Sequence, residues 1–456
     1  CFPKGGDTVG QHGARVRKVL WDVYYEFDNT RVGQFPIPAR RPLALTQLIQ
    51  READARAEVL PDRLVARGAP TRAALDAARA QAEERLACMI ALQEELDWQC
   101  YHFYGLTEDD LTLPPDQVPP QKLGERAFEI VMARRMTRGE LETTWFERHR
   151  SKPIAEVPCH WPAAYRELVA RRIALIEQDR DIGLIEQPEY KRRWNLPPWE
   201  EMARGALKNW LLDRMEAPAL WKDHALRSCA RLRDRLAADP EFLQVAGLYC
   251  SGPVTDLTAL VTELALDEAV PFLPVLRYTE SGVAKRSEWE RTWELQRRED
   301  SGEKVQIPVP PKYRREDFQS ATYWRLRGSL DVPKERFILY RYLEREADDT
   351  QVLGWAGWNH LEQARALVDY YQRMREEEGW PTERLKPVLA GIWDLAPWLK
   401  QWHNELDSET GVRLGDYFAA YVETQCQELG FPVAALQSWR PEATATHTGT
   451  RRRSTT

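Results

Sequence analysis

The sequence has no apolar run long enough to cross a membrane. Its apolar stretches fall well short of the ~20 residues that a membrane-spanning helix needs. A content of 43% hydrophobic and 30% charged residues is typical of a soluble globular protein. The first six residues, CFPKGG, lack the apolar segment of a signal peptide. These absences predict a cytoplasmic protein that does not bind a membrane.

Cysteine is scarce and irregularly spaced. The seven cysteines are an odd number, and none forms a Cys-x-x-Cys pair. Cys159 and His160 are adjacent, which is too close to make a zinc site by themselves. We therefore expect reduced thiols and no metal site.

Common catalytic motifs are also missing. The chain has no nucleotide-binding Gly-x-x-x-x-Gly-Lys-Ser/Thr loop, no Gly-x-Ser-x-Gly nucleophile turn and no His-Glu-x-x-His helix. A net charge of −7 does not by itself indicate a nucleic-acid partner, although local basic patches remain compatible with one. Methionine is absent before Met89, so we expect a piece of a longer polypeptide.

A long helix is the clearest regular pattern. Apolar residues between Leu75 and Phe103 recur at steps of three and four, which places one apolar stripe along a single helix. Thr71 is the expected N-cap and Gly105 the expected residue after the last turn. A short helix should restart at Thr107 and stop before Pro114. A first helix over residues 45–60 should pair antiparallel with the long one.

The rest of the chain predicts a mainly α fold with a smaller mixed α/β region. Within residues 236–345, the segments 323–330 and 336–342 alternate like the two strands of a hairpin with basic ends. After it we expect helices over 355–378, 381–392, 397–405 and 413–429. Tryptophans at helix spacing, such as Trp355 with Trp358 and Trp398 with Trp402, should pack between helices, with a partner-binding patch as the alternative. The predicted segments are residues 1–43, with strand-like runs; 44–112, the helical spacer; 113–235, a helical region; 236–345, the mixed region; 346–441, a carboxy-terminal helical region; and 442–456, a disordered tail.

Several basic residues are candidates for contact with DNA phosphates. For the five amino-terminal candidates, up to residue 31, a solvated surface charge is the alternative, and for residues 191–193 the alternative is a cationic helix end. The candidates are Lys4, Arg15, Arg17, Lys18, Arg31, Lys191, Arg192, Arg193, Arg325 and Arg327.

Residues 95–108, ELDWQCYHFYGLTE, resemble the helix that follows the target-recognition domain of large restriction–modification methyltransferases. Upstream, residues 21–27 followed by FPIP at 35–38 are similar to the closing segment of such a recognition domain, in the same order. The resemblance implies that residues 1–43 are the end of a target-recognition domain and that residues 44–112 are its helical spacer.

Later phrases sharpen this resemblance. The sequences IEQPEYKRRW at 185–194, PPKY at 310–313, YWRLRG at 323–328, LDVPKERF at 330–337 and LGWAGW at 353–358 resemble the phage-growth-limitation methyltransferases of type 2 bacteriophage-exclusion (BREX) defence systems. The family resemblance covers residues 21–439. It implies a site-specific adenine-N6 DNA methyltransferase that uses S-adenosylmethionine, acts on double-stranded DNA and works with other BREX/Pgl defence proteins.

The chemistry of that family is not found in these residues. Adenine methylation requires a glycine-rich cofactor turn and an Asn/Asp-Pro-Pro-aromatic loop for the flipped base. The nearest match is NLPPW at 195–199, where Leu196 cannot accept a hydrogen bond from the adenine amine. Two prolines opening a helix near Glu200 explain that match. We therefore expect no catalytic residue and no cofactor bound by this segment.

Three hypotheses follow for function. In the first, the chain is the carboxy-terminal, non-catalytic part of the methyltransferase, which helps to position DNA and to dock partners. In the second, it is an interaction module of a defence complex that does not touch DNA. In the third, it is a stand-alone specificity subunit, which would require an intact recognition domain that residues 1–43 are too short to supply.

Overall fold

The computed structural model describes residues 2–5, 8–9, 15–16, 23–26, 29–194, 196–408 and 411–441, with side chains at residue 30 and from residue 32 onward. Its contacts group into two compact units, Cys1–Ala206 and Leu207–Thr456. Helices dominate both units, and a small mixed sheet lies in the second, which confirms the predicted fold class. The boundaries of the predicted segments remain predictions.

None of the helices in the described ranges has the length and apolar character needed to cross a membrane.

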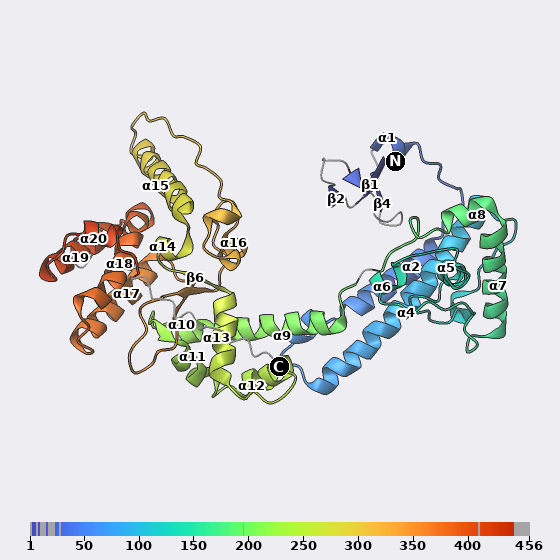
Figure 1. Ribbon diagram of the computed structural model, residues 1–456, viewed down its shortest axis with the longest axis horizontal. Helices are drawn as coiled ribbons and strands as arrows, with labels where there is room; N and C mark the ends of the chain where they lie inside the picture. The colour runs from blue at the N-terminus through green and yellow to red at the C-terminus, as the bar shows by residue number, and fades with distance from the viewer. Residues whose placement is uncertain are drawn as a thin grey trace, which may run out of the picture. The chain divides into compact units, whose positions relative to one another are not determined.

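The first unit is built on helix α4, Arg72–Phe103, which confirms the long predicted helix. The Thr71 hydroxyl accepts a hydrogen bond from the Ala74 backbone N–H at 3.1 Å, as an N-cap does. Gly105 has φ +69°, a conformation that favours glycine after a helix end. Helix α2, Leu43–Ala57, lies alongside α4 and buries Leu45 and Ile49 against it (Figure 1). This confirms the predicted helix pair.

The segment before this pair contains short strands. β1, Phe2–Gly5, pairs antiparallel with β4, Val23–Glu26, and β2, Thr8–Val9, pairs with β3, Arg15–Val16. Helix α1, Asn29–Gly33, follows them. The FPIP segment then contacts the end of α4, because the Tyr104 hydroxyl donates to the Pro36 carbonyl at 3.0 Å and its ring meets Phe35 edge-on.

The remainder of the first unit packs around the carboxy-terminal half of α4. Trp98 is fully buried there against Ile130, Trp161 and Tyr165. The short helix expected at Thr107 does not form, and the chain continues without regular structure to a single 3-10 turn, η2. Helix α3, Pro61–Ala66, lies between α2 and α4 in the chain. The elements that follow α4 are η2 Pro115–Gln117, α5 Ala127–Thr137, α6 Trp145–Arg148, α7 Ala163–Gln178 and α8 Arg180–Ile185. Helix α9, Trp199–Met215, begins in the first unit and ends in the second.

Charged side chains are also buried in this unit. The Arg172 guanidinium is 2.8 Å from Glu95 and donates to the Leu111 carbonyl. The Glu129 carboxylate accepts hydrogen bonds from Arg126, from the Trp145 indole at 3.0 Å and from the Gly124 backbone N–H at 2.8 Å. Because these charges are paired and hydrogen-bonded, they can be buried, but removing one partner leaves the other without compensation.

The second unit contains a four-stranded sheet with the order β5-β8-β7-β6. The β6–β7 pair is parallel and the other two pairs are antiparallel. Phe337 of the sheet is fully buried against Trp221, which is also fully buried. The strands are β5 Arg227–Ser228, β6 Ala269–Pro271, β7 Phe337–Leu339 and β8 Val352–Trp355. The helices are α10 Pro218–Trp221, α11 Cys229–Leu236, α12 Pro240–Tyr249, α13 Leu257–Asp267, α14 Pro274–Arg277, α15 Glu280–Asp300, η3 Arg315–Asp317, α16 Ala321–Arg327, α17 His360–Glu376, α18 Thr382–Trp402, α19 Leu414–Glu428 and α20 Ala434–Gln437.

The predicted hairpin over 323–330 and 336–342 is wrong. Its first half is helix α16, which Ser320 caps and Gly328, at φ +67°, terminates. Tyr323 and Leu326 are the buried pair, and their spacing of three fits a helix face. The second half contains β7, which pairs with β6 and β8 instead.

Two predicted helix boundaries also differ from the structure. Residues 352–355 form strand β8, and the helix expected from 355 starts at His360, where Asn359 caps it. The two helices expected over 381–392 and 397–405 are one helix, α18, with Pro387 and Pro397 inside it. Each proline removes one backbone hydrogen bond, and the long buried face of α18 compensates for that loss. The helix predicted over 413–429 is confirmed as α19.

Replacing Thr71 by Ala is expected to lower the free energy of unfolding of the first unit by about 1 kcal/mol, because the Ala74 N–H at the start of α4 loses its acceptor. Hydrogen exchange of the α4 amides, recorded across a series of urea concentrations, would measure this change in the free energy of unfolding. Thr46→Ala is the control, since this exposed hydroxyl donates to the Pro42 and Leu43 carbonyls and accepts no hydrogen bond from a backbone N–H at the start of α2. Equal destabilisation by both variants would contradict the capping role.

Candidate functional site

The side chains of the five amino-terminal candidates for phosphate contact lie outside the described residues. Lys4 and Arg15 belong to strands β1 and β3, and Arg31 to α1, but their side chains lie outside the described residues. Arg17 and Lys18 lie outside them altogether. The predicted tail at 442–456 lies outside the described residues as well.

Lys191 lies in the interior of the first unit. Its side chain is 2% exposed, and its ammonium is 2.6 Å from Asp97 and 2.7 Å from Glu186. Burial alone would lower the pKa of this lysine, but the surrounding carboxylates outweigh it and hold the pKa well above its ordinary value. Lys191 is therefore a structural cation, which removes it from the predicted phosphate contacts.

Arg192 and Arg193 follow Lys191 in a segment without helix. Arg192 is exposed, and its guanidinium lies over the Trp194 ring at 4.5 Å. Because α8 ends at Ile185, the alternative of a cationic helix end does not apply to residues 191–193. Arg192 thus remains a surface cation beside an aromatic ring.

Arg325 and Arg327 are not at the ends of a hairpin but on helix α16. Arg325 is half-exposed and pairs with Glu268 at 3.3 Å. Arg327 is nearly buried and donates to Glu335, with Asp331 at 3.6 Å. The positive charge of both arginines is therefore matched by carboxylates of the same unit.

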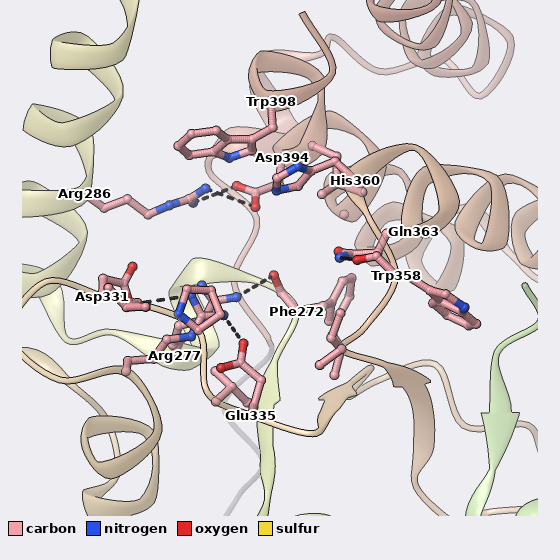
Figure 2. Close-up of a pocket in the computed structure, with 18 of the residues that line it drawn as sticks. Phe272, Arg277, Arg286, Asp331, Glu335, Trp358, His360, Gln363, Asp394 and Trp398 are labelled. Carbon is pink, nitrogen blue, oxygen red and sulfur yellow. Dashed lines mark hydrogen bonds and ion pairs between the residues drawn. The ribbon is translucent and has the colours of Figure 1, made fainter. Parts of the chain in front are cut away.

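A concave site that no sequence motif predicted lies in the second unit. It is a pocket of about 510 Å³. Phe272 and Tyr340 form part of its floor, next to the ends of β6 and β7. Figure 2 shows charged groups on two opposite sides of it. Both the volume and the mixture of aromatic walls with a few polar groups are typical of a small-molecule site.

One side of the pocket is formed by α15, α17 and α18. Arg286 of α15 makes two hydrogen bonds with Asp394 of α18, at 2.7 and 3.2 Å (Figure 2). His360 stacks on Trp398, with ring centroids 5.8 Å apart. Burial lowers the pKa of His360, and the nearby His403 lowers it further, so this imidazole is neutral at pH 7.

The opposite side comes from α14, α16 and the segment 331–335. Arg277 donates to the backbone carbonyls of Pro271 and Phe272. The Tyr278 hydroxyl and Arg327 hold the two carboxylates of this side, Asp331 and Glu335. Two buried atoms here have no hydrogen-bond partner, namely Asp331 Oδ1 and Arg327 Nε.

Five tryptophans line the pocket, and Trp293 contacts the rings of two of the others. Trp293 meets Trp398 and Trp402 edge-on, at centroid distances of 6.3 and 5.8 Å. Trp402 is 52% exposed, and the lining residues Leu330 and Val332 are similarly exposed. The predicted interhelix role of Trp398 is thus correct in part, while Trp402 also offers a free indole surface to solvent.

The described part of the chain has no cluster of three His, Cys, Asp or Glu side chains that could hold a metal. Helix α9 begins at Trp199, the last residue of the NLPPW segment, directly after the two prolines, which agrees with two prolines opening a helix. The residue at 195 lies outside the described residues.

Comparison with known proteins places the chain in a family. The family described as "Domain of unknown function (DUF7008)" matches residues 89–453. The chain belongs to the DUF7008 family. That match covers the second half of α4, the buried charges of the first unit and the whole pocket.

This DUF7008 chain also has a long curated relative. The adenine-specific methyltransferase PglX of Streptomyces coelicolor (strain ATCC BAA-471 / A3(2) / M145) is 44% identical over 458 residues, which cover 97% of the chain. The chain spans 37% of the length of that relative. The match confirms the predicted resemblance to the phage-growth-limitation methyltransferases. No solved structure matches the chain.

At the ends of β6 and β7, the described residues have no glycine-rich turn of the kind that holds a methyl-donor cofactor. A donor site needs a glycine-rich turn between a strand and a helix, where the backbone approaches the ligand. Strand β6 runs into Phe272, Leu273 and Pro274 without a glycine, and its partner β7 is followed by Tyr340. No step of methyl transfer is therefore assigned to this DUF7008 chain.

Proposed function

We propose that this chain is the carboxy-terminal, non-catalytic part of a site-specific adenine-N6 DNA methyltransferase of a BREX/Pgl phage-defence system. The observation that carries the proposal is the 44% identity to PglX across 97% of the chain. In this proposal S-adenosylmethionine and the target adenine are bound by parts of the enzyme that these residues do not include. This segment positions double-stranded DNA and docks other defence proteins.

The architecture of the first unit supports a positioning role. Helix α4 has 32 residues, and at about 1.5 Å per residue it is roughly 48 Å long. Its end is tied to the FPIP segment through Tyr104, Pro36 and Phe35. The same half of α4 is anchored to α7 by the buried ion pair between Glu95 and Arg172, and to α5 by a hydrogen bond from the Ala127 backbone N–H to Glu94. A helix held in this way transmits the position of the segment before it, as a spacer must.

The DNA part of the proposal is tested by the salt dependence of binding. We expect the chain to bind duplex DNA with an affinity that falls as salt rises, with a slope of about −0.9 in log K against log salt for each phosphate contact. The triple variant Arg15→Ala/Arg17→Ala/Lys18→Ala should flatten this slope by about 0.9 per lost contact. Fluorescence anisotropy across a salt series would measure it.

A matched control is Arg298→Ala, which removes an exposed arginine that is paired with Glu303 in the second unit. It should leave the slope unchanged. No salt-dependent retention by the unmodified chain, or an equal change in the control, would rule out DNA positioning by these residues.

The alternative is an interaction module of the defence complex without direct DNA contact. One observation favours it: among the candidate cations whose side chains are described, Lys191, Arg325 and Arg327 each have carboxylate partners. Measuring DNA binding across a series of salt concentrations separates the two functions. The alternative requires a chain that binds defence proteins but shows no salt-dependent binding to DNA.

A further inference from the structure

Two carboxylates on one side of the pocket share a single cation. Arg286 of α15 makes two hydrogen bonds with Asp394 of α18 and lies 3.3 Å from Glu290, one turn further along α15. Burial raises the pKa of Glu290, and the nearby Asp394 raises it as well, against the opposing charge of Arg286. The side chains of Glu290 and Asp394 keep 39% and 23% of their surface exposed. This side of the pocket therefore has a surplus of negative charge that a ligand can reach.

The charges on the opposite side of the pocket are balanced. Arg327 donates to Glu335 and has Asp331 at 3.6 Å. Figure 2 shows Arg277 next to the same two carboxylates, and its guanidinium also donates to the Pro271 carbonyl at 2.9 Å. Two cations thus meet two carboxylates here. An anionic ligand finds no unmatched cation in the pocket, whereas a cationic ligand finds the unmatched carboxylate beside α15 and α18.

Aromatic rings extend the acidic side of the pocket toward solvent. Trp293 follows Glu290 by one turn on α15, and Trp402 follows Asp394 by two turns on α18. The two rings meet edge-on at 5.8 Å, and Trp402 is 52% exposed. Arg297, a further turn along α15, donates to a side chain of α18 and does not line the pocket. Because indole faces attract cations, a cationic group can contact these rings and the carboxylate together.

An apolar rim surrounds this acidic and aromatic site. Leu330 and Val332 line the pocket and are 52% and 51% exposed, much like Trp402. Exposed apolar groups around a cavity mark binding sites on soluble proteins. A small cation by itself would leave this rim in water, but a peptide covers it with the residues on either side of a cationic side chain. The pocket, at about 510 Å³, is large enough for such a side chain.

We propose that the pocket receives an arginine side chain from an extended segment of a partner protein, with the guanidinium paired to Glu290 and stacked on the indoles of Trp293 and Trp402. A guanidinium suits the site because it is planar, stacks on aromatic faces and pairs with carboxylates through two N–H groups. This chain uses the same contact internally, where Arg384 lies 3.9 Å from the centre of the Trp380 ring. The inference deepens the docking part of the proposed function and rests on it.

The test is calorimetric titration of the full chain with the blocked peptide acetyl-Ala-Leu-Arg-Leu-Ala-amide. We expect saturable binding to one site. The same peptide with citrulline, which keeps the shape of arginine without its charge, should bind about tenfold more weakly because the ion pair and the cation–π contact are lost. Equal affinity for the two peptides, or no binding of either at millimolar concentration, overturns the proposal.

Blocked arginine alone, as N-acetyl-arginine methylamide, distinguishes a peptide from a small free cation. The peptide should bind several-fold more tightly, because its leucines cover the apolar rim formed by Leu330 and Val332. Equal affinity for the peptide and the blocked amino acid overturns the assignment to a partner protein, since the rim then contributes nothing.

Two variants test the residues assigned to the guanidinium. Glu290→Gln should weaken binding of the arginine peptide by about tenfold, the effect of losing a hydrogen bond between charged groups. Trp402→Ala should weaken it by about threefold, as expected for a cation–π contact at an exposed ring. Arg286 keeps its hydrogen bonds to Asp394 in both variants, so folding should be preserved. Unchanged affinity in either variant overturns the proposal.

Each variant has a matched control in the same unit. Glu294→Gln changes an exposed carboxylate one turn from Glu290 on α15, and Tyr417→Ala changes a ring that is 49% exposed on α19. Neither residue lines the pocket, so both controls should keep the affinity of the unmodified chain. Weakening by a control equal to that of its variant overturns the assignment to the pocket.

The peptide titration contains no DNA, so its outcome is separate from that of the salt series. Salt-dependent DNA binding without a preference for arginine over citrulline overturns this inference and leaves the proposed DNA positioning unaffected. A preference for the arginine peptide without DNA binding supports this inference and overturns DNA positioning.

Discussion

Replacing Lys191 by Met is expected to lower the free energy of unfolding of the first unit by about 3–5 kcal/mol, the usual result when one partner of a buried charge pair is removed. Glu186 and Glu94 are both buried next to this ammonium, and Asp97 is 2.6 Å from it. Without the lysine, these carboxylates remain in the interior with no cation at hydrogen-bonding distance. Native-state hydrogen exchange of the α4 amides reports on this unit alone.

The neighbouring Arg192→Met is the control for this prediction. Arg192 is exposed and contacts the Trp194 ring and Gln93, so its loss should change stability by less than about 1 kcal/mol. The pair of variants distinguishes a structural lysine from a surface contact for DNA. Similar small effects of both variants would show that Lys191 is not an internal counter-ion.

Replacing Glu129 by Gln is expected to destabilise the first unit by about 3 kcal/mol at pH 7, because the buried Arg126 loses its counter-charge. Burial alone would raise the pKa of Glu129. The charge of Arg126, with hydrogen bonds from Arg126, Trp145 and Gly124, outweighs burial and lowers the pKa below its ordinary value. Urea unfolding of both proteins, followed through the exchange of α5 amides, would measure the difference.

This prediction includes a dependence on pH. Because the pKa of Glu129 is lower in the folded state, the unfolded chain takes up the proton first as pH falls. The contribution of Glu129 is therefore complete above about pH 4.3, the ordinary glutamate pKa, and is lost as pH falls through the lowered value. The stability difference between the unmodified chain and Glu129→Gln should shrink over that range. Glu140→Gln, at an exposed pair with Arg138, should show no such change.

Local sequence patterns predicted the elements whose start, buried face and end are all specified by nearby residues. The spacing of apolar residues from Leu75 to Phe103, with Thr71 before and Gly105 after, was enough for α4 because a helix face, a cap and a stop are all local. The same holds for α19. The prediction failed at 323–330, where the run is short and fits two patterns. Its alternating residues fit a strand, but Tyr323 and Leu326, three positions apart, fit the buried face of the helix that forms.

The site was much harder to predict. The lining residues of the pocket come from β6 and β7, α14 to α18 and the intervening segments, and no motif links Arg286 with Asp394, which are 108 positions apart. At 191–193 the difficulty is that adjacent residues of the same charge have different environments. It is basic in sequence, yet burial separates Lys191 from the exposed Arg192 next to it. The only available signal for the pocket was the high tryptophan content, which did not indicate where the rings would meet.

By itself, the sequence determined the mainly helical class, the long capped helix and the resemblance to the phage-growth-limitation methyltransferases, since these depend on residue order over short distances. Only the tertiary structure decided which cations face carboxylates, which strands pair and which aromatic residues surround a cavity. The physical reason is that charge neutralisation and burial depend on partners brought together from distant segments. Such partners have no fixed spacing along the chain.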